Sequence, residues 1–484
     1  MKLEHSQSEA DCDETSYMNA SATKVSVPPI VNGDNGKVEE VDQCLLDPHH
    51  LMQWTVWGGF FGLGLVNNAG YVIMIAGAKD LDSSMVGLIF LCSVFPSGCV
   101  KATGPYWYHL LSYRRRVILC SMMMAMSFVV VGIGRTHEIT ALELLGVSLG
   151  SAQSGMGEAS FLALSSFFTP SSTALNGWSS GTGAAGIFGY AWVVFFSMGL
   201  QLDFSMTLYI ATCCLPIAFY IIFAFVLRSP RPEENRVLSS SVRSNSKTWG
   251  DDDQAVMGIS QSPMLMTPGD GEGGGYGSDD IPRNNRNSSS DTKEVEEARM
   301  TETTSSLTSA QRFQLTLRLW PYMVPLALVY FAEYAMQSGT WAAMGFPIGS
   351  EAARKEFYQF SNWTYQAGVL IARSSGALWT PTRGKLWFMP ALQCVFLAFS
   401  VANAYYMWWY DWSILLLCFL VGLQGGLCYI GVYSLIAIEV APELKEFSLA
   451  AASLADSFGI VLADVSGILI QKALYSYHGI TDSS

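Results

Sequence analysis

Apolar residues along the 484-residue chain gather in long, nearly unbroken stretches. An α-helix needs about 20 mostly apolar residues to cross the hydrocarbon core of a bilayer. Eleven stretches reach roughly this length, at residues 54–78, 84–104, 116–134, 142–168, 177–199, 204–227, 319–346, 358–380, 386–407, 412–436 and 447–473. The pattern therefore predicts an all-α polytopic membrane protein with about eleven transmembrane helices.

Polar segments divide this apolar chain. Residues 1–53 and 228–318 are poor in apolar side chains, so burial cannot offset the entropy lost on ordering them. We expect a disordered N-terminal tail and a disordered loop there. Between them lies a six-helix half at 54–227, and after them a five-helix half at 319–473, followed by a short tail at 474–484.

The formal charge of −13 is unevenly distributed. Residues 1–50 carry a net −7, residues 229–311 carry a net −6, and the remainder is formally neutral. The acidic balance thus belongs to the two polar segments. A neutral membrane body allows its buried charges to pair with one another.

Lysine and arginine gather on one side of the predicted helices, for example at 114–116, Arg383 and Lys385. Cytosolic loops of membrane proteins carry such an excess of basic residues. We therefore expect the N-terminus and the long loop to be cytosolic. An odd number of spans then places the C-terminus in the lumen.

Six helices, a long cytosolic loop and five more helices resemble the two-half bundle of major-facilitator transporters, with the last helix missing. In that architecture the solute binds near the middle of the membrane, between the halves. The sequence thus predicts a major-facilitator-like fold.

Four ionisable residues lie inside the apolar stretches: Glu158, Glu333, Arg373 and Asp456. A charge at the centre of a bilayer costs about 2.5 kcal/mol or more, so it normally faces a bundle interior or a water-filled path. We expect proton coupling or buried ion pairs for the three acids and for Asp464, which follows Asp456 by eight residues.

Arg373 is the best candidate for binding an anionic group, because a buried guanidinium stays charged and can hold a phosphate or carboxylate with two hydrogen bonds. The alternative is that it pairs with Glu333 or Asp456. Lys101 ends a predicted span, and we expect its side chain to reach the cytosolic surface.

Uncharged polar residues form a second group of candidates. Asn67, Asn68 and Tyr71 share one side of the first predicted helix. Gln366 shares a face with Arg373, and Gln424 precedes two glycines inside an apolar helix. We expect these residues to bind solute; hydrogen bonding between helices is the alternative.

No pattern indicates an enzyme, a cofactor or a metal centre. The segment 181–186 matches G-x-G-x-x-G, but it lies in an apolar helix, where small residues favour close helix packing. The sequon at Asn362 lies in or beside a predicted span, so its glycosylation is doubtful.

The quoted residues resemble the battenin family, the membrane proteins of Batten disease. The resemblance extends in order over residues 54–473. Its motifs are Gly64–Asn68 with Tyr71, Gly155–Glu158, Trp178–Gly183, Val329–Tyr334, Tyr365–Val369, Ala372–Ser375 and Ala455–Gly459. The ionisable residues of the family's motifs correspond to Glu158, Glu333, Arg373 and Asp456.

The resemblance implies a protein of the lysosomal or vacuolar membrane with a major-facilitator-like fold. The first hypothesis is a transporter or efflux facilitator for a small anionic or polar solute, with glycerophosphodiesters as the candidate class and a link to lysosomal pH homeostasis. The second is a non-transporting adaptor that binds trafficking proteins through its cytosolic tail and loop. The third is a vacuolar basic amino-acid transporter. We expect no nucleic-acid partner.

Overall fold

The computed structural model describes residues 48–77, 86–228, 307–376, 378 and 381–480. These residues belong to one compact unit, Pro48–Ser484. The predicted N-terminal tail, apart from its last residues, and most of the predicted loop lie outside the described residues.

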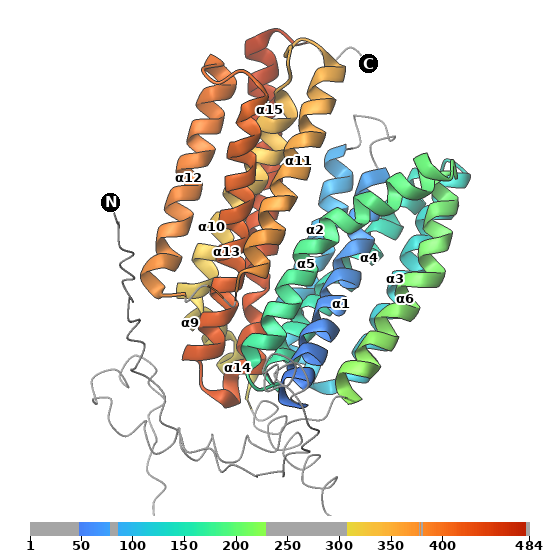
Figure 1. Cartoon of the computed structure of the whole chain (residues 1–484), viewed down its shortest axis with the longest axis vertical. Coiled ribbons are helices and arrows are strands. Elements are labelled where there is room, and N and C mark those ends of the chain that lie inside the picture. The colour runs from blue at the N-terminus through green and yellow to red at the C-terminus, as the bar shows by residue number, and fades with distance from the viewer. Residues whose placement is uncertain (1–47, 78–85, 229–306, 377, 379–380, 481–484) are drawn as a thin grey trace, which may run out of the picture. The chain divides into compact units, whose positions relative to one another are not determined.

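The described part of the first half consists of helices joined by short connections. They are α1 (Pro48–Gly77), α2 (Val86–Trp107), η4 (Tyr108–Leu110), α3 (Tyr113–Thr136), α4 (Thr140–Ser165), α5 (Ser171–Val193), η5 (Val194–Gly199) and α6 (Phe204–Arg228). Figure 1 shows α1 to α6, in blue to green, gathered side by side. Within this half, α1 packs on α5, and α4 packs on both α2 and α3.

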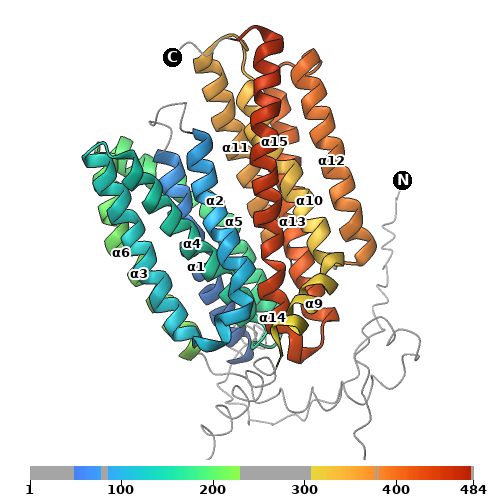
Figure 2. The same cartoon turned by 180° about the vertical axis from the view of Figure 1, so that it is seen from behind.

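The described part of the second half also consists of helices joined by short connections. Its helices are α9 (Ser309–Arg318), α10 (Trp320–Ala335), η8 (Met336–Trp341), α11 (Glu351–Ser374), α12 (Arg383–Tyr406), η9 (Trp412–Ile414), α13 (Leu415–Glu439), α14 (Pro442–Ala452) and α15 (Leu454–His478). Seen from both sides, these helices, in yellow to red, form a second group (Figure 2). Here α11 packs on α13, and α10 packs on α15.

The two halves are joined mainly by α5 with α11 and α13, by α2 with α14 and α15, and by α4 with α14; α9 also touches α2. A continuous core of buried apolar side chains includes Trp178 of α5 and Tyr429 of α13. The polar residues described below lie along this junction.

Every predicted span overlaps a helix of the structure, so the prediction of an all-helical two-half bundle is confirmed. Among the described helices, five are long and apolar enough to cross a membrane, or six if the bent pair α9 and α10–η8 is one span. Helices at the junction, such as α4 and α5, are less apolar than a typical membrane span. Small and polar residues replace apolar ones where these helices face other helices. The number of eleven spans therefore stays a prediction.

The predicted boundary at 318 differs from the structure, because residues 309–318 form α9. A capping box begins this helix: Gln311 N donates to Thr308 Oγ1, and Thr308 N donates to Gln311 Oε1 at 2.8 Å. Such reciprocal bonds satisfy two amides that a helix N-terminus otherwise leaves unpaired. The predicted span at 447–473 is likewise divided, because α14 ends and α15 begins around Ser453.

Candidate functional site

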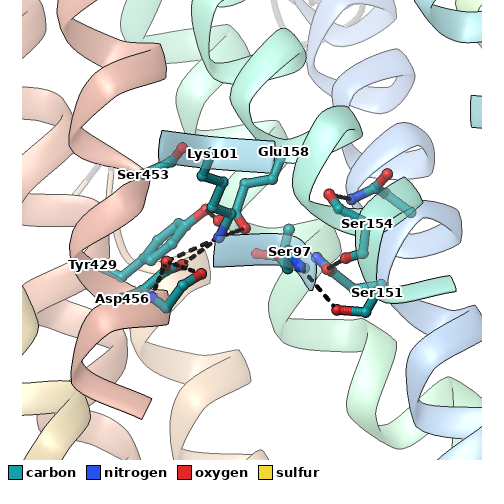
Figure 3. Close-up of polar contacts among 12 residues, drawn as sticks. Ser97, Lys101, Ser151, Ser154, Glu158, Tyr429, Ser453 and Asp456 are labelled. Atoms are coloured by element: carbon teal, nitrogen blue, oxygen red, sulfur yellow. Dashed lines mark hydrogen bonds and ion pairs between the residues drawn. The ribbon is translucent and has the colours of Figure 1, made fainter. Parts of the chain in front are cut away.

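A buried lysine joins acids from both halves of the molecule. Lys101 Nζ on α2 lies 2.7 Å from Glu158 Oε2 on α4 and 2.8 Å from Asp456 Oδ1 on α15. These residues are only 3%, 8% and 5% exposed. Figure 3 shows Lys101 between the two carboxylates, which we call the Lys101 triad. The triad is an ion-paired bridge from the first half to the second.

Residues close in sequence to the triad hold its members in position. Gly155 leaves no room for a side chain, since a Cβ there would lie 2.5 Å from Ser97 Oγ, so α2 and α4 approach closely. Ser97 N donates to Ser151 Oγ at 3.1 Å across the same contact. On α15, Asp456 lies in the first turn and accepts hydrogen bonds from its neighbour Ser457. An acid in the first turn is stabilised by the helix dipole.

Aromatic side chains extend the triad toward α5 and α11. The hydroxyl of Tyr429 on α13 donates to Glu158 Oε1 at 2.7 Å and accepts from Trp178 Nε1 at 3.1 Å. The Arg373 guanidinium carbon lies 4.0 Å from the centre of the Tyr429 ring. A cation over an aromatic face is attracted by the ring electrons. The triad and Arg373 are therefore parts of one polar junction.

Arg373 is held by neutral groups. Its Nη1 donates to Thr182 Oγ1 on α5 at 2.7 Å, and its Nη2 donates to the Tyr330 hydroxyl on α10 at 2.8 Å. Its Nε is buried with no hydrogen-bond partner among the described residues. No described carboxylate lies within ion-pair distance of it, so the alternative that Arg373 pairs directly with Glu333 or Asp456 is wrong. Its charge can attract an anion.

Glu333 on α10 is 2% exposed and has one hydrogen bond: the Tyr365 hydroxyl donates to its Oε1 at 3.0 Å. Its Oε2 is buried without a partner among the described residues. Gly425 of α13 makes room for this oxygen, because a Cβ there would lie 1.9 Å from it. One turn later, the side-chain nitrogen of Gln337 is also buried, and no described residue pairs with it.

The asparagines of α1 bind α4. Asn67 is fully buried; its side-chain nitrogen donates to Ser154 O at 3.1 Å, and its oxygen accepts from Gln153 Nε2 at 2.9 Å. Asn68 Oδ1 accepts from Ser154 Oγ at 3.2 Å. This geometry favours interhelical hydrogen bonding over solute binding, and a solute-binding role stays a prediction.

The two predicted glutamines contact different helices. Gln366 is half-buried against α5, where its Oε1 lies 2.5 Å from the position of a Cβ on Gly186. Gln424 Nε2 donates to Met389 O and so ties α13 to α12. The structure therefore brings Gln366, but not Gln424, to the contact between the halves.

Tyr71 and Asp464 form a further pair of predicted residues. Both are half-buried, and they lie close enough to interact electrostatically. The Tyr71 hydroxyl also hydrogen-bonds with the Ser93 side chain. Asp464 is two turns beyond Asp456 on α15, so it lies apart from the Lys101 triad along the helix axis.

The expectation that Lys101 reaches the cytosolic surface is wrong. Its helix does not end at residue 104 but continues to Trp107, which leaves Lys101 almost two turns inside α2. Trp107 and the following Tyr108 are the aromatic pair that often marks a membrane interface, and they were the signal available in the sequence. Tyr429, Trp178 and Thr182 were missed as site residues too.

Two smaller predictions concern helix packing and glycosylation. The glycines of 181–186 do pack helices: a Cβ at Gly181 would lie 2.0 Å from Phe61 O, which confirms the packing interpretation. Asn362 is buried in α11, where its side-chain nitrogen donates to Tyr358 O at 2.7 Å. Among the residues with described positions, no group of His, Cys, Asp and Glu could hold a metal ion.

Comparison with solved structures defines the class of protein. The proton:xylose symporter XylE, a major-facilitator protein, matches with a TM-score of 0.52 at 11% sequence identity, covering 89% of this chain and 90% of that one. The likeness shows the fold. Together with the apolar helices it defines a multi-pass membrane protein of the major-facilitator fold.

Sequence comparison defines the family. The family model described as CLN3 protein matches residues 58–477, and the chain belongs to this family. Protein BTN1 of Yarrowia lipolytica is 30% identical over 439 residues, covering 89% of this chain and 96% of the relative. Battenin of Canis lupus familiaris is 28% identical over 451 residues, covering 86% and 90%. The resemblance to battenin seen in the sequence is confirmed.

Proposed function

We propose that this protein is a transporter of the lysosomal or vacuolar membrane that moves a small polar solute. Glycerophosphodiesters are the candidate class. The observation that carries the proposal is Arg373, a half-buried guanidinium at the junction of the two halves whose described hydrogen-bond partners are all neutral. A phosphodiester anion can replace Thr182 and Tyr330 as its partner, with the stronger bonds that a charged acceptor provides.

The position of Arg373 supports transport rather than static binding. It extends from α11 of the second half and contacts Thr182 on α5 of the first half. In major-facilitator proteins the halves move against each other around a central site. A solute held there contacts both halves, so its binding can be linked to their relative movement.

The buried acids Glu158 and Asp456 are less suited to bind a basic amino acid. Glu158 and Asp456 already share Lys101, so a second cation would have to displace it. The adaptor function depends on the N-terminal tail and the long loop, which lie almost entirely outside the described residues.

Flux in proteoliposomes tests the proposal. We expect the purified full chain to move radiolabelled glycerophosphoglycerol, and Arg373→Ala to reduce its initial rate by about tenfold or more, the equivalent of about 1.4 kcal/mol of lost binding. Arg373→Lys keeps the charge but not the planar fork, so we expect partial activity.

Arg383→Ala is the matched control, because Arg383 is an exposed arginine that pairs with the half-buried Glu439 at the end of α13. Its flux should equal that of the unmodified protein. Equal flux in Arg373→Ala and unmodified protein rejects the assignment of Arg373, and no flux in any of them rejects the transport function.

A further inference from the structure

Three buried acids lie near the junction of the two halves, Glu158, Asp456 and Glu333, and they differ in how their charge is compensated. Glu158 has Lys101 at 2.7 Å and a hydrogen bond from Tyr429. Asp456 has the same lysine and two hydrogen bonds from Ser457. Glu333 has one neutral donor and no ion pair within the described part of the chain. Of these three acids, Glu333 alone lacks, among the described residues, the partners that an ionised carboxylate needs.

The balance of charges around Glu333 also favours its protonated form. Lys101 and Arg373 together offset Glu158 and Asp456, and Arg373 interacts electrostatically with Glu158. An ionised Glu333 would add an unbalanced negative charge to this buried region. Burying an uncompensated charge costs several kcal/mol, and a carboxyl group avoids this cost by binding a proton.

The titratable neighbours of Glu333 do not change this balance. Those that interact with it electrostatically are Tyr330 and Tyr334 on α10, Tyr365 and Arg373 on α11, and Cys428 on α13. Arg373 is the only cation in this set, and its two end nitrogens are already bonded to Thr182 and Tyr330. On α15, Asp456 interacts with Tyr330 and Tyr334, which adds negative charge to this region, and no other described cation acts on Glu333.

We infer that Glu333 is the proton-binding residue of this protein, and that it binds one proton together with an anionic solute at Arg373. The inference rests on the proposed transport function. The proton bonds to Oε2 and converts the carboxylate to a carboxylic acid, while Oε1 keeps its hydrogen bond from Tyr365. On release, the proton passes to water and the carboxylate is regenerated.

The coupling follows from electrostatics. An ionised Glu333 weakens the attraction of Arg373 for an anion, and a protonated Glu333 restores it. Because binding linkage is reciprocal, the anion equally favours the protonated acid. Proton and anion therefore bind together on the acidic side and leave together on the neutral side.

Infrared difference spectroscopy tests proton binding without any transport. We expect the purified full chain to show the C=O stretching band of a buried carboxylic acid, and Glu333→Gln to lose it. Tyr365→Phe should keep the band but move it to higher frequency, because the hydrogen bond to the carbonyl oxygen is removed. A band that persists in Glu333→Gln, or that does not move in Tyr365→Phe, overturns the inference.

Binding of radiolabelled glycerophosphoglycerol tests the coupling. For the unmodified protein we expect an affinity about tenfold higher at acidic than at neutral pH, within the usual range of coupling. Glu333→Gln should bind with the same affinity at both pH values. A pH dependence that survives in Glu333→Gln contradicts the assignment.

Glu351→Gln is the matched control, because this exposed acid at the start of α11 makes an ion pair with exposed Lys355. It should keep both the infrared band and the pH dependence. If the unmodified protein binds no solute but shows the Glu333 band, the proposed solute class fails while the proton site stands. Loss of the pH dependence in Glu351→Gln overturns the coupling test.

Discussion

The Lys101 triad and the Glu333 carboxyl are both buried in the membrane body, and they differ in their partners. In the triad, one lysine holds an acid of its own half and an acid of the other half. Within the described part of the chain, Glu333 has one hydrogen bond, from the second half, and a buried oxygen with no partner. Complete pairing suits a residue that holds helices together, whereas incomplete pairing suits one that exchanges a proton or responds to a ligand.

The two halves are also joined by two kinds of contact, one ionic and one between a cation and neutral groups. The triad joins α2 and α4 to α15 through ions, and Arg373 joins α11 to α5 through neutral partners. An ion pair buried at 3–8% exposure costs more to separate than a bond to a hydroxyl. We therefore expect the triad to stabilise this arrangement of the halves. The hydrogen bonds of Arg373 should be replaced when a solute binds.

The largest effect should come from Lys101→Met. The substitution leaves two buried carboxylates without a counter-ion, and breaking a buried pair in this way costs about 3–5 kcal/mol. We expect a corresponding fall in the free energy of unfolding of the detergent-purified protein, measured by chemical denaturation.

Neutralising the acids should recover much of this loss, because the triple variant with Glu158→Gln and Asp456→Asn leaves no buried charge unpaired. Lys355→Met removes an exposed i,i+4 pair and should cost only about 0.3–0.5 kcal/mol. Similar losses for Lys101→Met and Lys355→Met contradict a structural role for the triad.

Tyr429→Phe should have the next largest effect. It removes the hydrogen bond to Glu158 and leaves Trp178 Nε1 without its acceptor. A hydrogen bond to a charged group contributes about 1.5–3 kcal/mol, so we expect a loss of about 2 kcal/mol in the same measurement.

Tyr433→Phe is the matched control, one turn further along α13. The Tyr433 hydroxyl is buried with no hydrogen-bond partner among the described residues, so removing it should not destabilise the protein. Equal losses in the two variants indicate that the ring environment, rather than the bond to Glu158, decides the effect.

Glu333→Gln should change stability least among the buried acids. The amide has the shape of the protonated acid, and its oxygen can still accept from Tyr365. We expect a change in unfolding free energy below about 1 kcal/mol, since the volume is conserved. Glu158→Gln, which removes an ion-pair partner of Lys101, should lower the unfolding free energy by more. A larger loss for Glu333→Gln than for Glu158→Gln contradicts the distinction between paired and unpaired acids.

The sequence was sufficient for the helices and for the burial of Glu158, Glu333 and Asp456, because both depend on local composition. Apolar stretches place the spans, and an acid inside a span is expected to face the interior of the bundle. The partners themselves are a property of the tertiary structure: Lys101 and Asp456 are 355 residues apart, and no local pattern connects them. Lys101 was misjudged because α2 extends beyond its last strongly apolar residues to Trp107.

The tyrosines were missed for another reason. Tyr429 and Tyr433 are four residues apart and share a face of α13, which alone suggests only a packed aromatic surface. Their roles differ because Glu158 and Trp178 reach one hydroxyl and not the other. Burial can be predicted from the sequence, but which buried hydroxyl receives a partner depends on how the two halves meet.

The smallest effect concerns His109, a titratable group outside the spans that must be separated from Glu333 in any pH experiment. Burial, together with the nearby Arg312 and Arg116, lowers the pKa of His109 below its usual 6.5. Arg312 Nη1 lies 3.1 Å from His109 Nδ1 and also donates to Pro105 O at 2.8 Å, which docks α9 on the end of α2. Protonation of His109 therefore opposes this docking.

The sign of the effect follows from the lowered pKa. As pH falls below about 6.5, the unfolded chain binds a proton that the folded protein resists, so stability decreases until His109 is also protonated in the fold. The loss should be about 0.5 kcal/mol or less, because the group is partly exposed and solvent screens its neighbours. His109→Gln should remove this part of the stability profile while leaving the pH dependence of solute binding intact. If His109→Gln instead abolishes the pH dependence of binding, the proton that accompanies the solute is bound outside the membrane body, and the contrast between paired and unpaired buried acids no longer explains coupling.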